Sequence, residues 1–208
     1  IGSGYTGGKN VDVTNLDNDD VFGTSISLNS AGERLAVGAE LDDGAGNAAF
    51  ETGAAYLFSF TDNDFNGGTL ESTVGKGYTG GKNVDVANLD DNDQFAFSVS
   101  LNGTGDRLAV GPRNDDGAGN AANSIGAAYL FSFSDTVFNN GILVSTIGKG
   151  YTNGNPKDVN VTLDDNDEFG FGVSLNATGD RLAVGAEDDN GAGNTAVASG
   201  AAYLFSFT

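Results

Sequence analysis

The chain has 208 residues, of which 33 are glycine, 38% are hydrophobic and 10% are aromatic, a composition that suits a β-rich globular protein. Its 29 acidic and 9 basic residues give a formal charge of −20, which argues against nucleic acid or an anionic membrane surface as a partner. Cysteine and histidine are absent, which excludes thiolate and imidazole metal sites and the Ser-His and Cys-His pairs of nucleophilic enzymes. No apolar run approaches the roughly 18 residues of a membrane helix, so direct membrane insertion is not expected.

Nearly the same stretch of residues occurs three times along the chain, and the tyrosines and most phenylalanines recur at a spacing of about 73 residues. The repeat units span 1–74, 75–147 and 148–208, with cores at 20–60, 93–133 and 167–207. The third unit is incomplete, and the chain starts at Ile1 and contains no methionine. We therefore expect a processed product, a fragment of a longer repeat protein, or one part of an assembly.

Within each unit the apolar residues alternate with period two, which predicts strands separated by Gly, Asn and Asp turns, and no helix. In the first unit the strands are expected at 22–28, 34–39, 54–60 and within 68–78. The first strand places large residues on one face and Gly and Ser on the other, whereas both faces of the third strand are apolar enough to be buried.

Four antiparallel strands per unit, repeated and covered on both faces, are typical of the blade of a β-propeller. The fold class predicted is therefore all-β, with propeller-type repeats. A β-solenoid or a string of small sandwiches is the alternative. Three blades cannot close a ring, because propellers typically have about four to eight. We therefore expect further repeats, or copies that associate to complete a ring or stack into an array.

The pair Phe22-Gly23, its counterpart Phe169-Gly170, and the SxSL-type, LAVGA and GAAYLF segments that follow resemble the FG-GAP repeats of integrin α-subunit propellers and of their bacterial surface relatives. The resemblance implies a β-propeller, calcium-binding loops and an extracellular adhesion or ligand-binding role. Two departures stand out. The second unit has Phe95-Ala96, and the link between the first two strands, where the family has its calcium loop, is only NSAGER in the first unit.

Acidic and amide residues cluster instead in two other loops of every unit. Calcium takes about 6 to 8 oxygen ligands from carboxylates, amides and carbonyls, and glycine lets the backbone curl around the ion, so both loops are candidate calcium sites. The first choice is the loop after LAVGA, with Asp42, Asp43, Asn47, Asp115, Asp116, Asn120, Asp189, Asn190 and Asn194. The second choice is the loop before the Phe-Gly pair, with Asp17, Asp19, Asp90, Asp91, Asp164 and Asp165.

The same residue types are also ordinary turn formers, and surface acid keeps a protein soluble in salt, so bare turns are the alternative to calcium. Paired carboxylates serve glycosidases, but acids repeated three times in turn loops make a poor asymmetric active site. No catalytic residue and no enzymatic activity are therefore predicted.

Two functions fit these observations. The first is a non-enzymatic, secreted or cell-surface module that uses calcium-stabilised loops for adhesion or ligand binding, with a surface protein or a glycan as partner. The second is a structural subunit of an extracellular filament, sheath or surface layer, in which strand edges join copies of the chain or further repeats. The near identity of the units favours assembly, because a specific ligand site needs loops that differ.

Overall fold

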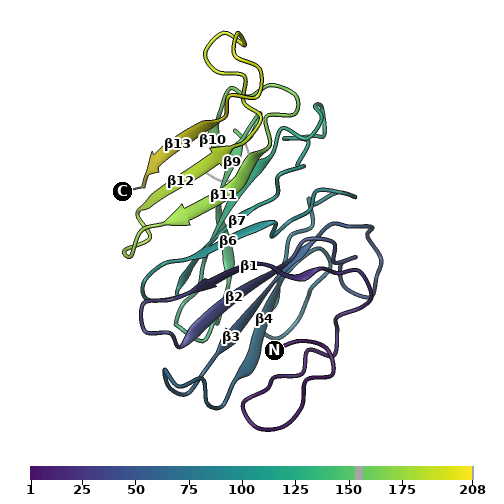
Figure 1. Ribbon diagram of the computed structural model, residues 1–208, viewed down its shortest axis with the longest axis vertical. Coiled ribbons are helices and arrows are strands. Elements are labelled where there is room, and N and C mark those ends of the chain that lie inside the picture. The colour runs from purple at the N-terminus through teal and green to yellow at the C-terminus, as the bar shows by residue number, and fades with distance from the viewer. Residues whose placement is uncertain (153–156, 208) are drawn as a thin grey trace.

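The computed structural model describes residues 1–152 and 157–207, and thirteen strands in three sheets make up its regular structure. The described residues contain no helix, so the all-β class is confirmed. The sheets follow one another along the molecule in chain order, with the first at one end and the third at the other (Figure 1). The described residues contain no helix that could span a membrane.

The first sheet has strand order β1-β2-β3-β4-β5, and its first four strands are antiparallel. Its strands are β1 Phe22–Leu28, β2 Arg34–Ala39, β3 Ala54–Ser59, β4 Thr69–Gly75 and β5 Val84–Asp85. The predicted strands of the first unit are therefore confirmed. The fifth strand was not predicted. It runs parallel to β4 and comes from the connector that leads to the first strand of the second unit.

The second sheet repeats this order, and the third sheet has three strands, β11-β12-β13. The second contains β6 Ser98–Leu101, β7 Arg107–Gly111, β8 Ala127–Ser132, β9 Ile142–Gly148 and β10 Val159–Asn160. The third contains β11 Phe169–Leu175, β12 Arg181–Ala186 and β13 Ala201–Ser206. The sheets thus have five, five and three strands, where four per unit were predicted.

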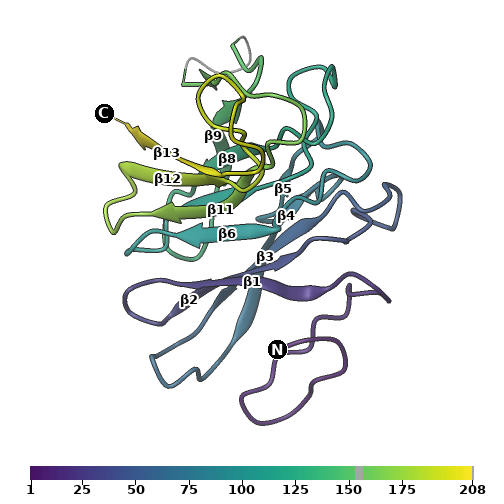
Figure 2. The same cartoon turned by 45° about the horizontal axis from the view of Figure 1, so that its top comes forward.

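The first strands of the three sheets lie next to one another. Both views place β11, β6 and β1 in succession (Figure 2), and each later first strand packs on the sheet before it. One apolar core fills the space between the first and second sheets, where Leu57 and Val74 meet Phe95 and Leu101. A second core fills the space between the second and third sheets. The sheets therefore stack face to face, with their cores between units.

Hydroxyl groups, rather than a shared strand ladder, join the neighbouring first strands. The amide of Val99 in β6 donates to Ser25 Oγ of β1 at 3.0 Å, and the amide of Leu101 donates to Ser27 Oγ at 2.9 Å. The same contact recurs one unit later, where the amides of β11 donate to Ser98 and Ser100. The small face predicted for the first strand is thus the face that receives the next sheet.

Candidate functional site

A buried carboxylate lies at the centre of the loop after the second strand in every unit. Asp115 is 2% exposed, and its Oδ1 accepts a hydrogen bond from the amide of Gly117 at 2.8 Å. The hydroxyl of Tyr129 donates to Oδ2 at 2.8 Å, and that of Tyr151 donates to both oxygens at 2.9 and 3.0 Å. Asp42 is held in the same way by Gly44, Tyr56 and Tyr78.

The third unit has a reduced version of this centre. Asp189 Oδ2 accepts from the hydroxyl of Tyr203 at 2.6 Å, and Oδ1 accepts from the amide of Gly191 at 2.7 Å. The second tyrosine of the first two units comes from the connector after the fourth strand, which the third sheet does not have. The sequence shows the tyrosines only as residues that recur with the repeat, whereas the structure makes Tyr56, Tyr78, Tyr129, Tyr151 and Tyr203 hydrogen-bond donors to the buried acid.

Burial controls the protonation of these groups. It raises the pKa of Asp42 and of Asp115, and the hydrogen bonds from the tyrosines work in the opposite direction. Burial and the neighbouring carboxylate raise the pKa of Tyr129 and Tyr151, so both phenols stay protonated and remain donors. The centre is therefore a buried carboxyl group whose two oxygens both accept hydrogen bonds from the protein itself.

The other predicted residues of this loop tie it to its surroundings. Asp43 Oδ1 accepts from the amide of Glu51 at 2.7 Å. Asn47 Nδ2 donates to Asp17 Oδ2 at 2.8 Å, which joins the two predicted acidic loops across 30 residues of sequence. The two other units repeat both contacts. Asp116 accepts from the amide of Ser124, and Asn190 accepts from the amide of Ala198. Asn120 donates to Asp90, and Asn194 donates to Asp164.

The remaining second-choice residues lie at the surface. Asp19, Asp91 and Asp165 are exposed at the tips of the loops that precede the first strand of each sheet. The structure therefore brings the two acidic loops together through one Asn-Asp pair per unit and leaves these tip residues outside that contact.

One acid in each unit was not assigned a role from the sequence. Asp93 is 4% exposed, and its Oδ2 accepts a hydrogen bond from the amide of Asp90 at 2.7 Å. Burial, with the nearby charges of Asp115, Asp90 and Asp116, raises the pKa of Asp93 to about 8. Asp20 and Asp167 occupy the same position and their pKa values are also raised, first by burial. Acids from both loops thus converge on one buried carboxyl group.

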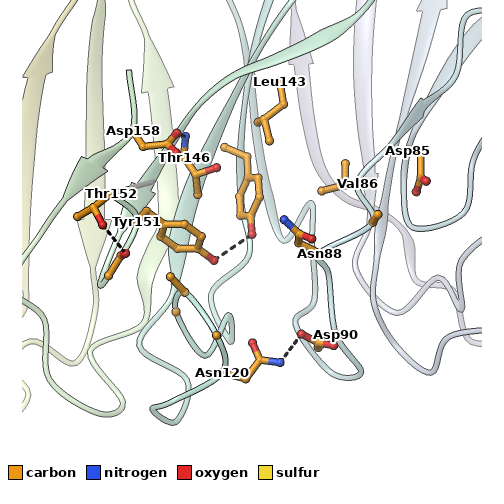
Figure 3. Close-up of a pocket in the computed structure, with 16 residues that line it drawn as sticks. Asp85, Val86, Asn88, Asp90, Asn120, Leu143, Thr146, Tyr151, Thr152 and Asp158 are labelled. Carbon is orange, nitrogen blue, oxygen red and sulfur yellow. Dashed lines mark hydrogen bonds between the residues drawn. The ribbon is translucent and has the colours of Figure 1, made fainter. Parts of the chain in front are cut away.

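A polar cavity opens beside this acid cluster in the second unit (Figure 3). Its volume is about 790 Å³, and Asp85, Asp90, Asn120 and Tyr151 are among the residues that line it. The Asn120-Asp90 pair lies at one side and the phenol of Tyr151 points toward the hydroxyl of Tyr129. A smaller cavity of about 450 Å³ occupies the matching place in the first unit. The site is therefore a feature of the repeat.

The cavity offers carboxylates, amides and phenols, which suit a cation or the hydroxyl groups of a sugar. The described residues contain no group of three or more acidic side chains already placed to hold a metal ion. Asp42 and Asp115 accept hydrogen bonds on both oxygens. The outer residues of the two loops make their contacts at the surface, as the Asn120-Asp90 pair does.

The raised pKa of Asp93 predicts that the protein loses stability as the pH rises. The folded chain retains a proton at Asp93 up to about pH 8, whereas the unfolded chain releases it near the ordinary value of 3.8. The stabilisation from the protonated Asp93 is complete below pH 3.8, its ordinary pKa in the unfolded chain. It is lost as the pH rises through about 8, the pKa of Asp93 in the folded chain. Between pH 5 and 8 we expect the free energy of unfolding to fall by about 1 kcal/mol per pH unit.

The measurement is urea unfolding at several pH values with a chelator present. Asp93→Asn keeps an oxygen acceptor for the amide of Asp90 and removes the titration, so its profile is expected to be flatter and its stability at pH 8 higher. A wild-type profile that rises between pH 5 and 8 contradicts the prediction.

Comparison with known protein families identifies one repeat. No curated protein matches the chain. Residues 87–131, which carry β6, β7 and most of β8 together with the acidic loops of the second unit, match the family described as FG-GAP repeat. This is the unit with Phe95-Ala96 in place of Phe-Gly, and its Ala96 adopts a φ of 67°, in the region where Gly23 and Gly170 also lie at 101° and 99°. Residues 87–131 of the second unit are therefore similar to an FG-GAP repeat.

Proposed function

We propose that this chain is a non-enzymatic, extracellular repeat module for adhesion or ligand binding, built from propeller-type units and stabilised by calcium. FG-GAP repeats are typically extracellular, and they are generally non-enzymatic. The observation that carries the proposal is the polar cavity beside the two acidic loops, which recurs in the first two units with volumes of about 450 and 790 Å³. A site repeated along a rigid stack suits a partner that is engaged at several points.

The lining of the cavity points to a surface glycan or a polar loop of a surface protein as partner. Tyr151 supplies an aromatic ring, and Asp90, Asn120 and Asp158 supply carboxylate and amide groups that suit hydroxyl groups. Binding of the chain to an array of immobilised glycans tests this part. Tyr151→Ala is expected to abolish the signal, and Tyr5→Ala, at an exposed position of the same residue column, is expected to leave it intact.

Calcium is supported by the electrostatics of the paired loops. The charges of Asp90, Asp115 and Asp116 all raise the pKa of Asp93, so the loops hold more negative charge than the protein neutralises. The first unit has the same arrangement, since Asp17, Asp42 and Asp43 act on Asp20. An ion between the loops would be held by the outer residues, Asp90, Asp116 and Asn120 in the second unit. Its chemistry there is charge neutralisation and cross-linking of two loops.

Bound calcium is expected to raise the melting temperature. At a free concentration of about 100 times Kd, binding to the folded state alone contributes about 2.7 kcal/mol per site, which corresponds to about 5 to 10 °C for a chain of this size. Differential scanning calorimetry with calcium or with a chelator measures the shift. Asp116→Asn is expected to reduce it. Asp135→Asn, at an exposed acid outside both loops, is the matched control. Equal melting temperatures with calcium and chelator contradict the calcium proposal.

A structural subunit of an extracellular filament, sheath or surface layer is the second candidate. It is favoured by the sameness of the units, because the buried Asp-Tyr centre, the Asn-Asp pair and the hydroxyl contacts between sheets all recur. Electron microscopy of the purified chain tests this candidate, because discrete closed rings or monomers would contradict an open filament or sheath.

A further inference from the structure

The chain contains the same contact between sheets twice, and backbone atoms form its centre. A Cβ added to Gly38 would lie 2.1 Å from the carbonyl oxygen of Ala96, and one added to Gly111 would lie 1.9 Å from that of Gly170. The first and second sheets therefore each present a glycine to the next unit, at Phe95-Ala96 and at Phe169-Gly170. Only glycine permits this approach, because any side chain would overlap the neighbouring backbone.

The third sheet presents the same surface, and the described residues do not cover it. We call this surface the end face and define it by Ser174, Gly185, Gly200, Ala202 and Leu204. Leu204 is 81% exposed, whereas its counterparts Leu57 and Leu130 are 0% and 7% exposed. A hollow of about 560 Å³ lies on this face, lined by Gly185 and Gly200 among others. A Cβ added to Gly185 would have only atoms of its own sheet near it, at 3.8 Å.

The first sheet presents the complementary surface. We call it the start face and define it by Val21, Phe22, Ile26 and Leu28. Ile26 is 69% exposed and Leu28 is 47% exposed. Their counterparts in the second sheet, Val99 and Leu101, are each 5% exposed because they lie against the first sheet. The start face is thus the surface that the later sheets use to pack on the sheet before them.

Main-chain groups on the two faces continue a pattern that already runs through the chain. The turn after each first strand donates to the next turn, as the amide of Ser30 does to the oxygen of Gly103 at 3.1 Å and the amide of Gly103 to that of Ala177 at 2.9 Å. Among the described residues, Ala177 lies in the last turn of this series and Ser30 lies in the first. The amide of Ala177 and the oxygen of Ser30 are therefore the matching groups at the two ends.

The backbone beside the start face has the same conformation as the matching segments of the second and third units, which contact the unit before them. Val21 has a φ of 53°, close to the 54° and 51° of Gln94 and Glu168, whose amides donate to loop carbonyl oxygens of the preceding unit. Positive φ is rare for a β-branched residue and needs a stabilising environment. In the second and third sheets, that environment is the contact with the sheet before. The segment around Val21 is thus shaped for a partner of the same kind.

We propose that the start face of one copy of this chain docks on the end face of a second copy, head to tail. The two faces are different surfaces, so the contact is heterologous and generates a ring if the rotation between copies closes and an open polymer if it does not. Leu204 would be covered by the partner as Leu57 and Leu130 are covered within the chain. The proposal does not depend on what the cavity binds or on calcium.

The test is complementation between two variants with one damaged face each. Ile26→Lys blocks the start face and Leu204→Lys blocks the end face, and both positions are exposed, so folding is expected to be unchanged. Sedimentation velocity of the wild type in chelator is expected to show species larger than the monomer that grow with concentration. Each variant alone is expected to be monomeric, and their equimolar mixture is expected to form a dimer and nothing larger.

Two controls separate this result from general stickiness. Ile142→Lys makes the same change at a site that is 58% exposed on β9, away from both faces, and is expected to assemble as the wild type does. Gly185→Ala adds one methyl group in the hollow and is expected to prevent assembly while changing the free energy of unfolding of the monomer by no more than about 1 kcal/mol. A monomeric wild type at about 100 μM, a mixture that stays monomeric, or a dimer formed by either variant alone would overturn the proposal.

Discussion

Replacing Gly111 by alanine is expected to lower the free energy of unfolding by about 3 kcal/mol or more. The added Cβ would lie 1.9 Å from the carbonyl oxygen of Gly170, and both groups belong to strands with little freedom to move. The second and third sheets would have to separate, which would open the core that contains Leu130, Phe169 and Val184. Chemical unfolding followed by far-UV circular dichroism measures the loss.

The matched control for Gly111→Ala is Gly185→Ala, at the same position of the third sheet. There the added Cβ has no atom nearer than 3.8 Å, so a change within about 1 kcal/mol, in either direction, is expected. Equal losses in the two variants would show that the position matters for strand formation alone and that the close approach of the sheets is not what requires glycine.

Replacing Asp115 by alanine is the second change with a large expected effect. The hydroxyls of Tyr129 and Tyr151 and the amide of Gly117 all donate to this carboxylate. Removing it leaves buried donors without an acceptor, and each such group costs about 1 to 3 kcal/mol. We expect a loss of about 3 kcal/mol or more at pH 6, where Asp93 is still protonated.

Two comparisons identify the cause of that loss. Asp115→Asn keeps an oxygen acceptor of the same shape and is expected to recover most of the stability. Asp189→Ala removes the counterpart in the third unit, which has one tyrosine donor instead of two, and is expected to cost less than Asp115→Ala. Unfolding curves for the three variants at one pH provide the test, and an equal loss for Asp189→Ala would contradict the role given to Tyr151.

The strand positions could be predicted from sequence because alternation and turn residues are local signals. The predicted first, second and third strands coincide closely with β1, β2 and β3. The second unit departs at its start, since β6 begins only at Ser98, two residues after Ala96 adopts a positive φ. The short strands β5 and β10 were missed because a parallel pair of two residues leaves no alternation to detect.

The candidate site could be predicted in part. The sequence identified both acidic loops, and the structure joins them through Asn47 and Asp17 and the matching pairs. The burial of Asp42 could not be read from the loop, because its hydrogen-bond donors Tyr56 and Tyr78 lie 14 and 36 residues away. The last aspartate of the loop before the first strand, Asp20 or Asp93, was not assigned a role for the same reason, since its raised pKa arises from burial and from charges that include those of another loop.

One residue that departs from the repeat pattern, Arg113, connects two units of the structure. Arg113 replaces the glutamate found at the same position in the other two units. Its guanidinium lies 4.3 Å from the centre of the Phe97 ring and 3.6 Å from the carboxylate of Glu168. Nε donates to Gln94 at 3.1 Å. This residue therefore ties the second sheet to the third, a contact between units that a single repeat does not reveal.

The contact of glycine with a backbone carbonyl has a consequence for how such a chain can change. Because main chain meets main chain at Gly38 and Gly111, the rotation from one sheet to the next is set by backbone shape and not by the choice of side chains. Loop sequences can then diverge without altering the curvature of the stack. The surface chemistry of this chain can therefore change independently of its curvature. New recognition loops can be introduced while the rotation between neighbouring sheets stays the same.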